Sequence, residues 1–336
     1  MALIILMILW TPTLRCSEEF ETLEFFAGRG NLSRCMRLSG RKTCSFDILY
    51  KSGKGRSRPY GSNAMDINST SGYALCILAL LCTKIRFLAT YAIKCASWTA
   101  VNRGTSGRSA CASIGHEGFA SVDNSNTMAS RTCLLCLLTT ALGGTWAVEQ
   151  PELSVLEYFP PFLALLTALY KAYGETAVYR AKWYMLHYGS LTPKPHYAWC
   201  NSNAIQGLNM GRLLGWKKRL ALGDIPKVKT CETYKDKNGK TRYKGTAALR
   251  KTEEYPVRFG FKLVDLYDDL TTSSRGRAPF PSDPAGIPSA PESFRRMPEG
   301  GHALQFAQLD QVFNYLRRGK HMVIPNEWKD LVPKPK

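Results

Sequence analysis

Strand-like and helical segments alternate along the chain from Thr22 to Trp199, and this alternation limits the possible folds more than any other feature. The predicted strands are residues 22–26, 43–48, 86–93 and 145–149, and the predicted helices are residues 32–38, 72–81 and 128–142. Strands separated by helices that can cross over a sheet pair in parallel, with helices on both faces. We therefore predict an α/β fold.

Two further strand-like segments, residues 178–187 and 196–199, follow the alternating region. The proline-rich stretch Thr192–Pro195 joins them and is too short to contain a crossover helix. We therefore expect the two strands to pair antiparallel at one edge. The predicted sheet is mostly parallel and ends in an antiparallel pair.

The chain is strongly basic, with 45 lysine and arginine residues against 26 acidic residues, a net charge of +19. More than half of this charge lies in residues 212–262, which hold 15 basic and 5 acidic residues. Within it, residues 233–243 read as a hairpin with an Asn-Gly turn, and tyrosines are interspersed. This composition predicts contact with a nucleic-acid backbone, although a solvated, lysine-rich hairpin fits the same pattern.

Composition divides the chain into five segments. They are an apolar amino-terminal segment (1–20), the α/β domain (21–205), a basic extension with the hairpin (206–270), a linker (271–301) and a helix with a tail (302–336). The apolar run is too short to span a membrane, which needs about 20 residues, and it lacks the flanks of a secretory signal. The linker holds 15 proline, glycine and serine residues in 31, and Leu309 to Leu316 keep amphipathic helical spacing.

Eleven cysteines are an odd number in a chain large enough to fold without disulfides, so we expect reduced thiols and an intracellular location, nuclear or cytoplasmic. The one Cys-x-x-Cys pair, Cys133 and Cys136, lies in an apolar helical run without a second pair or histidines nearby. We therefore predict core packing and no metal site.

The most informative motif lies between the first strand and the first helix, where Gly28 and Gly30 are separated by one residue. Ligands of open α/β sheets bind at the carboxyl ends of the strands, and this turn lies at such an end. Glycine lets the backbone turn tightly and approach a ligand without a Cβ in the way. The motif predicts a nucleotide-type ligand, although a purely structural turn fits it as well.

The residues around this turn favour S-adenosylmethionine (SAM) over a nicotinamide dinucleotide. Ser33 holds the place of the third glycine of the dinucleotide pattern. Glu24 would repel a pyrophosphate but suits a cationic aminoacyl group. Asp47 follows the second strand nineteen residues after Gly28, near the spacing at which an acid accepts hydrogen bonds from ribose hydroxyls. We expect Asp66 to meet the adenine amino group.

Residues 24–30, Glu-Phe-Phe-Ala-Gly-Arg-Gly, resemble the first motif of class I SAM-dependent methyltransferases, and their Phe-Ala-Gly-x-Gly core is most similar to that of the cytosine-5 DNA methyltransferases. Residues 102–109, 149–151 and 188–194 are also similar to uncharacterised methyltransferase-like proteins of dinoflagellate algae. The resemblance implies a Rossmann-like methyltransferase sheet that binds SAM. The candidate cofactor residues are Glu24, Phe26, Ala27, Gly28, Arg29, Gly30, Asp47, Ile48, Asp66 and Ile67.

The cytosine-5 family uses a Pro-Cys nucleophile and a later glutamate, and Cys95 and Glu149 occupy these places by order. A thiolate that adds to C6 of the ring activates C5, and a carboxylic acid at N3 stabilises the adduct. Lys94 replaces the expected proline and would lower the pKa of the Cys95 thiol, and we find no QxRxR-type strand. An incidental thiol is therefore the alternative for Cys95, and a structural hydrogen-bonding role is the alternative for Glu149.

The loop at residues 102–109 mixes arginine with glycine and serine, so it offers guanidinium groups and backbone amides to phosphate. The candidate substrate contacts are Trp98, Asn102, Arg103 and Arg108, with Trp98 placed to stack a base. A solvated loop and a packed tryptophan fit the same pattern.

These observations together predict a SAM-dependent methyltransferase that acts on nucleic acid, either DNA or RNA. The alternative is a nucleic-acid-binding protein that keeps the fold but has lost methyl transfer, because fold does not imply function. A third possibility, an NAD-dependent oxidoreductase, rests on the glycine turn alone.

Overall fold

The computed structural model describes residues 19–48, 65–99, 102–221, 228 and 230–273. The chain divides into two units, residues 1–282 and 283–336, and all described residues belong to the first. The apolar amino terminus up to residue 18, the linker from residue 274 onward and the predicted carboxyl-terminal helix lie outside the described residues.

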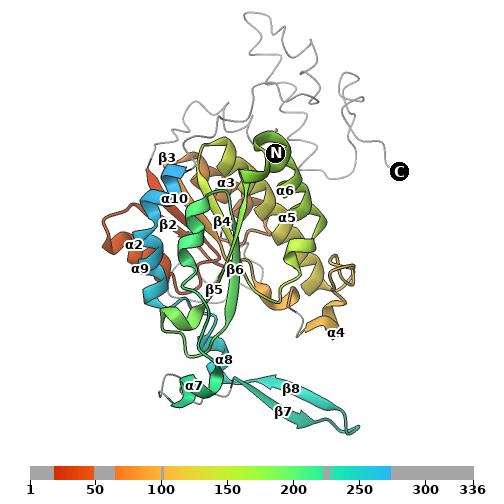
Figure 1. Ribbon diagram of the computed structural model, residues 1–336. Helices are drawn as coiled ribbons and strands as arrows, with labels where there is room; N and C mark the ends of the chain where they lie inside the picture. Colours follow the sequence, from red (N-terminus) through yellow and green to blue (C-terminus); the bar gives the residue numbers. More distant parts are fainter. Residues whose placement is uncertain (1–18, 49–64, 100–101, 222–227, 229, 274–336) are drawn as a thin grey trace, which may run out of the picture. The chain divides into compact units, whose positions relative to one another are not determined.

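Six strands form one sheet in the order β2-β1-β3-β4-β6-β5 (Figure 1). The strands are β1 (Phe20–Phe25), β2 (Thr43–Phe46), β3 (Thr83–Tyr91), β4 (Thr145–Pro151), β5 (Tyr179–Tyr184) and β6 (Pro195–Cys200). The first four pair in parallel, and β6 is antiparallel to both β4 and β5. The sheet is Rossmann-like, and the predicted α/β class, with its antiparallel pair at the edge, is confirmed.

Helices cover both faces of this sheet (Figure 1). One layer is formed by α3 (Thr70–Leu81), α5 (Ala120–Ala141) and α6 (Pro160–Tyr173), and the other by α2 (Asn31–Leu38), α9 (Val257–Asp265) and α10 (Tyr267–Ser273). Successive strand residues point to opposite faces, so Phe87 belongs to the first core and Leu88 to the second. Residues 145–148 of β4 are all buried, as a central strand that is covered on both faces requires.

Shorter elements connect these layers. The short helices are η1 (Cys95–Ser97), α4 (Arg103–Ser106), η3 (Leu156–Tyr158), η4 (Glu175–Ala177), η5 (Met185–Tyr188), η6 (Asn203–Leu208), α7 (Trp216–Ala221) and α8 (Ala247–Lys251). Strands β7 (Cys231–Lys235) and β8 (Thr241–Gly245) form the expected antiparallel hairpin. Asp236 Oδ1 accepts the amides of Asn238 and Lys240, and Gly239 has a φ of 75°, which a glycine adopts at little cost.

The carboxyl-terminal part of the basic segment belongs to the main domain. Phe259 and Leu263 of α9 are buried in one core with Leu32 and Met36 of α2. Gly260 lies where a Cβ would come within 2.7 Å of the Cys35 sulfur, so the two helices pack closely at this point. This packing brings the segment just before α9 beside the glycine turn that precedes α2.

Candidate functional site

The glycine turn joins β1 to α2 at the carboxyl end of β1. Gly28 has a φ of 54° and Gly30 a φ of 67°, in the left-handed region that favours glycine. Phe26 also has a positive φ, 60°, which is strained for an aromatic residue. The Gly28 amide donates a 2.6 Å hydrogen bond to Asp47 Oδ2, just past the end of β2. Asp47 therefore lies directly against the turn.

Glu24 lies beneath this turn and is 1% exposed. Its Oε2 accepts hydrogen bonds from the amide and the hydroxyl of Ser33, at 2.8 and 2.5 Å, in the first turn of α2. Burial raises the pKa of Glu24 to about 7, although the Ser33 hydrogen bonds oppose the rise. Glu24 thus ties β1 to α2, and it is not among the residues that line the neighbouring cavity.

A cavity of about 440 Å³ opens beside the glycine turn. Its wall combines the turn, the segment that follows β3, the end of β4, the β5–β6 connection and the segment before α9. The lining residues are Phe26, Ala27, Gly28, Arg29, Asn31, Ala92, Ile93, Lys94, Cys95, Ala96, Glu149, Pro151, Met185, Ser190, Lys194, His196, Thr252, Glu253, Glu254, Tyr255 and Pro256. The sheet order thereby brings both predicted catalytic residues and the glycine turn to one hollow.

Glu149 lies at the centre of a hydrogen-bonded group in this cavity. The Tyr255 hydroxyl donates to Glu149 Oε2 at 2.6 Å, and His196 Nδ1 contacts Glu149 Oε1. His196 lies on β6 opposite Pro151, diagonal to Glu149 and on the same face of the sheet. Two partners therefore hold the carboxylate from different parts of the chain.

These partners determine the charge of the group. Burial alone would raise the pKa of Glu149, but the imidazole of His196, the Tyr255 hydroxyl and a nearby lysine hold it below its usual value. Burial and the Glu149 carboxylate raise the pKa of Tyr255 well above its usual range. Glu149 is therefore ionised at neutral pH, and Tyr255 keeps the proton that it donates.

Cys95 lines the cavity at the start of η1. Burial raises the pKa of its thiol, and the charge of Glu149 raises it further. Lys194, on the β5–β6 connection, opposes the rise. The expected lowering by Lys94 is therefore not found: the thiol form predominates at neutral pH, and the cation that acts on it is Lys194.

The other predicted cofactor residues lie outside the cavity lining. Asp66 Oδ1 accepts the Asn68 amide at 2.9 Å just before α3, and Ile67 is buried in the core. Arg131 binds the carbonyl of Ile67 at 2.6 Å. Ile48 is exposed after β2. The structure thus brings Asp47 to the glycine turn, and it places Asp66 and Ile67 in the turn that caps α3.

Trp98 and Arg108 form an internal pair. The Arg108 guanidinium lies 3.6 Å from the centre of the Trp98 ring, and both side chains are at most 2% exposed. Arg108 also donates to the Ser97 hydroxyl and to backbone carbonyls, including that of Val122 at 3.2 Å. A base cannot reach either face of the pair in this arrangement, so we correct the expectation that these two residues contact substrate.

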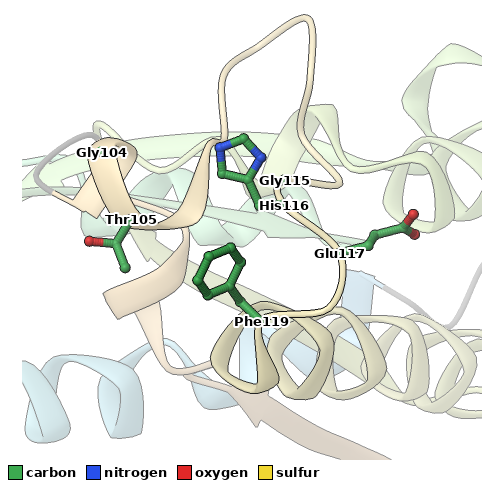
Figure 2. A pocket seen from close by; sticks show the side chains of 6 residues that line it. All are labelled: Gly104, Thr105, Gly115, His116, Glu117 and Phe119. Carbon is green, nitrogen blue, oxygen red and sulfur yellow. The ribbon is translucent and has the colours of Figure 1, made fainter.

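Asn102 and Arg103 are exposed at the start of α4, and the Asn102 side chain donates to the Ala96 carbonyl. Between α4 and the segment before α5 lies a second hollow of about 600 Å³, lined by Gly104, Thr105, Gly115, His116, Glu117 and Phe119. Figure 2 shows the rings of His116 and Phe119 next to each other, with the Glu117 carboxylate directed away from them. A Cβ at Gly107 would lie 2.3 Å from the His116 ring, so glycine is required there.

Sequence reasoning did not identify His196, Tyr255 or Lys194 as site residues. Lys194 donates to the Thr252 carbonyl at 2.5 Å, and Asn31 donates to the Tyr255 carbonyl at 2.8 Å. These contacts fix residues 252–256 against the cavity across more than fifty positions in sequence. A single histidine on a short strand and a tyrosine in a basic segment carry no local signal of such a role.

Within the ranges that the structure describes, no group of three or more histidine, cysteine, aspartate or glutamate side chains is arranged to hold a metal ion. None of the helices in these ranges is both long and apolar enough to cross a membrane.

No protein-family model matches this chain, and no curated protein matches it. A search of solved structures matches the crystal structure of the S. pombe Dnmt2 methyltransferase, with 11% sequence identity and a TM-score of 0.29. The match covers 62% of this chain and 55% of that chain, so it spans about half the length of the S. pombe protein.

Proposed function

We propose that this chain is a SAM-dependent methyltransferase. The observation that carries the proposal is the 2.6 Å hydrogen bond from the Gly28 amide to Asp47, beside a cavity that also holds Cys95 and Glu149. In Rossmann-like folds the carboxyl edge of the parallel strands is the ligand-binding edge. The glycine turn and two polar candidate residues thus share one hollow of a size usual for small-molecule sites, and Asp47 lies against the turn just outside its lining.

The residues present fit SAM. A Cβ at Gly28 would meet no atom within 4 Å, so the backbone there is open to a ligand on the cavity side. Glu253 adds a carboxylate to the wall that suits the cationic aminoacyl group of SAM, whereas Glu254 is paired with Arg29 at 2.9 Å. Asp47 would hold the ribose hydroxyls, and Asp66 remains our prediction for the adenine. When bound, SAM supplies a methyl group on a positively charged sulfur.

We further propose that the acceptor is a nucleic acid. The hairpin of β7 and β8 is basic, and every residue of β7 is exposed. Tyr234 is 52% exposed on this strand and the following Lys235 is also exposed, so the hairpin presents a stacking group and a cation to solvent. These features support binding to the phosphate backbone, and they carry no sequence preference.

A nucleic-acid-binding protein without transfer activity is the second candidate. Both Glu149 oxygens already accept hydrogen bonds from within the chain, and the Cys95 thiol is poorly ionised. Incubation with tritiated SAM and separate total RNA, genomic DNA and protein acceptors distinguishes the candidates. Label in one acceptor supports the methyltransferase, whereas SAM binding without label in any acceptor supports the binding protein.

The cofactor assignment is tested by calorimetric titration of SAM into the wild-type chain and two glycine variants. Gly28→Ala places a methyl group in the cavity, and we expect at least tenfold weaker binding. Gly143→Ala is the matched control, because Gly143 also has a positive φ and open space around it but lies between α5 and β4. Both variants should lose about 1 kcal/mol of stability from the strained φ. Equal SAM affinity in the two variants would remove the assignment.

A further inference from the structure

Three side chains from distant parts of the chain meet on one wall of the cavity. Glu149 lies near the end of β4, His196 lies on β6, and Tyr255 precedes α9. The carboxylate accepts from Tyr255 through one oxygen and contacts His196 Nδ1 through the other. A carboxylate held on both oxygens cannot rotate freely, so it fixes the orientation of the imidazole ring.

We propose that His196 is the proton acceptor of the methyl-transfer reaction, with Glu149 and Tyr255 as positioning residues. The acceptor that such a site serves is a hydroxyl or a nitrogen that carries a proton, not a ring carbon activated by a thiolate. This inference rests on the proposed function, and it names the chemical class of the atom that is methylated.

The unpartnered nitrogen of His196 is the observation behind this assignment. Nε2 is buried and has no hydrogen-bond partner among the described residues, and His196 is one of the residues that line the cavity. A buried polar atom without a partner destabilises the fold, so a ligand group that bonds to Nε2 removes that cost. The imidazole is also packed against the Trp183 ring, with centroids 6.1 Å apart. It is therefore held in place from two sides.

The hydrogen bond at Nδ1 determines which nitrogen can accept a proton. A neutral imidazole carries one proton, and a carboxylate partner at Nδ1 keeps the proton on that nitrogen. Nε2 then has the free lone pair. The same arrangement of carboxylate and imidazole orients the ring in serine hydrolases and stabilises the imidazolium that forms. Glu149 therefore suits His196 to the task of a general base.

The alternative nucleophile in the cavity is less suited to neutral pH. Covalent addition to a ring carbon needs a thiolate at Cys95, and burial together with Glu149 raises the pKa of that thiol. The Lys194 ammonium group donates to the Thr252 carbonyl, and an ammonium group has no lone pair to accept a proton. His196 instead offers a lone pair on a ring whose orientation Glu149 and Trp183 fix.

Atoms and electrons balance in the proposed step. The acceptor's oxygen or nitrogen forms a bond to the methyl carbon while the carbon–sulfur bond breaks, and the sulfur keeps that electron pair as a neutral thioether. The acceptor's proton passes to Nε2 of His196, and the imidazolium is stabilised by Glu149. Water later removes the proton from His196 and restores the neutral ring.

The tautomer of His196 gives a readout that does not depend on activity. The chain holds five histidines, and long-range ¹H–¹⁵N correlation spectra of ¹⁵N-histidine-labelled protein separate the two neutral tautomers. We expect the His196 signal, assigned by its loss in His196→Asn, to show a protonated Nδ1 and an unprotonated Nε2. Glu149→Gln should remove this preference, whereas His187→Gln, on η5 outside the cavity lining, should leave it unchanged. A protonated Nε2 in the neutral wild-type ring would overturn the inference.

The transfer test uses His196→Asn, because the asparagine amide can still donate to Glu149 but offers no lone pair at the place of Nε2. With tritiated SAM and the total RNA, genomic DNA or protein fraction that the wild type labels, we expect the rate to fall at least 100-fold. SAM affinity, measured by calorimetry, should change less than threefold.

A transfer rate for His196→Asn within threefold of the wild type would overturn the inference and leave the methyltransferase proposal intact. Wild-type SAM binding without transfer to any fraction would overturn the role of His196 as proton acceptor. Failure of the wild-type chain to bind SAM would instead remove the proposed function, whichever tautomer is found. Tyr255→Phe, which keeps the base, should reduce transfer less than His196→Asn does.

Discussion

The stability of Glu24→Gln relative to the wild type should increase as the pH rises from acid to neutral. Glu24 is almost fully buried, and its pKa rises from 4.5 to about 7 on folding. Between these values the folded state keeps a proton that the unfolded chain has released, so the free energy of unfolding falls as the pH rises. A difference of about 2.5 in pKa corresponds to about 3 kcal/mol. Glutamine does not titrate, so the free energy of unfolding of Glu24→Gln should not decrease for this reason as the pH rises.

The assay is urea unfolding of the wild type and Glu24→Gln at several pH values from 4.5 to 8. The glutamine carbonyl can accept the Ser33 hydrogen bonds, and any fixed cost of its amino group cancels when only the change with pH is compared. We expect the stability of Glu24→Gln relative to wild type to rise by about 2–3 kcal/mol across this range. Glu175→Gln, at an exposed position of η4, is the control and should show no such trend. Parallel curves for Glu24→Gln and wild type would refute the reasoning.

Three further outcomes are expected. Arg108→Ala removes the partner of the Trp98 ring and leaves buried carbonyls unpaired. Urea unfolding should therefore show that the free energy of unfolding falls by about 3–5 kcal/mol, and a decrease below about 1 kcal/mol would contradict the internal pairing. Cys95→Ser should keep methyl transfer within about tenfold of wild type, because the proposed reaction passes through His196; complete loss in a folded variant would favour the covalent route. Replacing Lys235 and Lys237 on the hairpin by glutamine should weaken RNA and DNA binding alike. The slope of log affinity against log salt concentration should fall by about one for each lysine that binds a phosphate. Filter binding at several salt concentrations measures both effects.

The fold was predictable because its signal is local and repeated. Short strand-like runs alternate with longer segments that can form crossover helices, and the connection at Thr192–Pro195 is too short for a crossover. Helix α6 and the packing of α9 on α2 were not predicted. Their burial depends on partners far along the chain, such as the close approach of Gly260 to Cys35, and no local pattern records such partners.

The site was predictable where a backbone conformation or a spacing carries it. Gly28 and Gly30 adopt positive φ values, and Asp47 lies against the turn, whereas its contact with a ribose stays a prediction. The opposite holds for Tyr255, which the sequence places in a basic surface segment and the structure places against Glu149. Charge composition predicts the average exposure of a segment, but the position of a single side chain depends on long-range packing.

Arg108 is a residue for which the local sequence indicated a ligand contact and the structure shows an internal role. An arginine among glycines and serines resembles a phosphate-binding loop, yet a hydroxyl and three carbonyls from residues 97 to 122 enclose its guanidinium. An arginine is rarely buried unless it is paired, and the pairing here comes from the folded loop itself. Sequence reasoning alone could not distinguish this internal role from a contact with a ligand.

A crystal structure of the chain with S-adenosylhomocysteine, the product-like thioether, tests the central claim most directly. The account predicts density for the ligand along residues 28–30, with its ribose at Asp47 and its sulfur on the side of the cavity that holds His196. A ligand bound elsewhere, or a cavity filled by the segment at residues 252–256 with no ligand at saturating concentration, would contradict it.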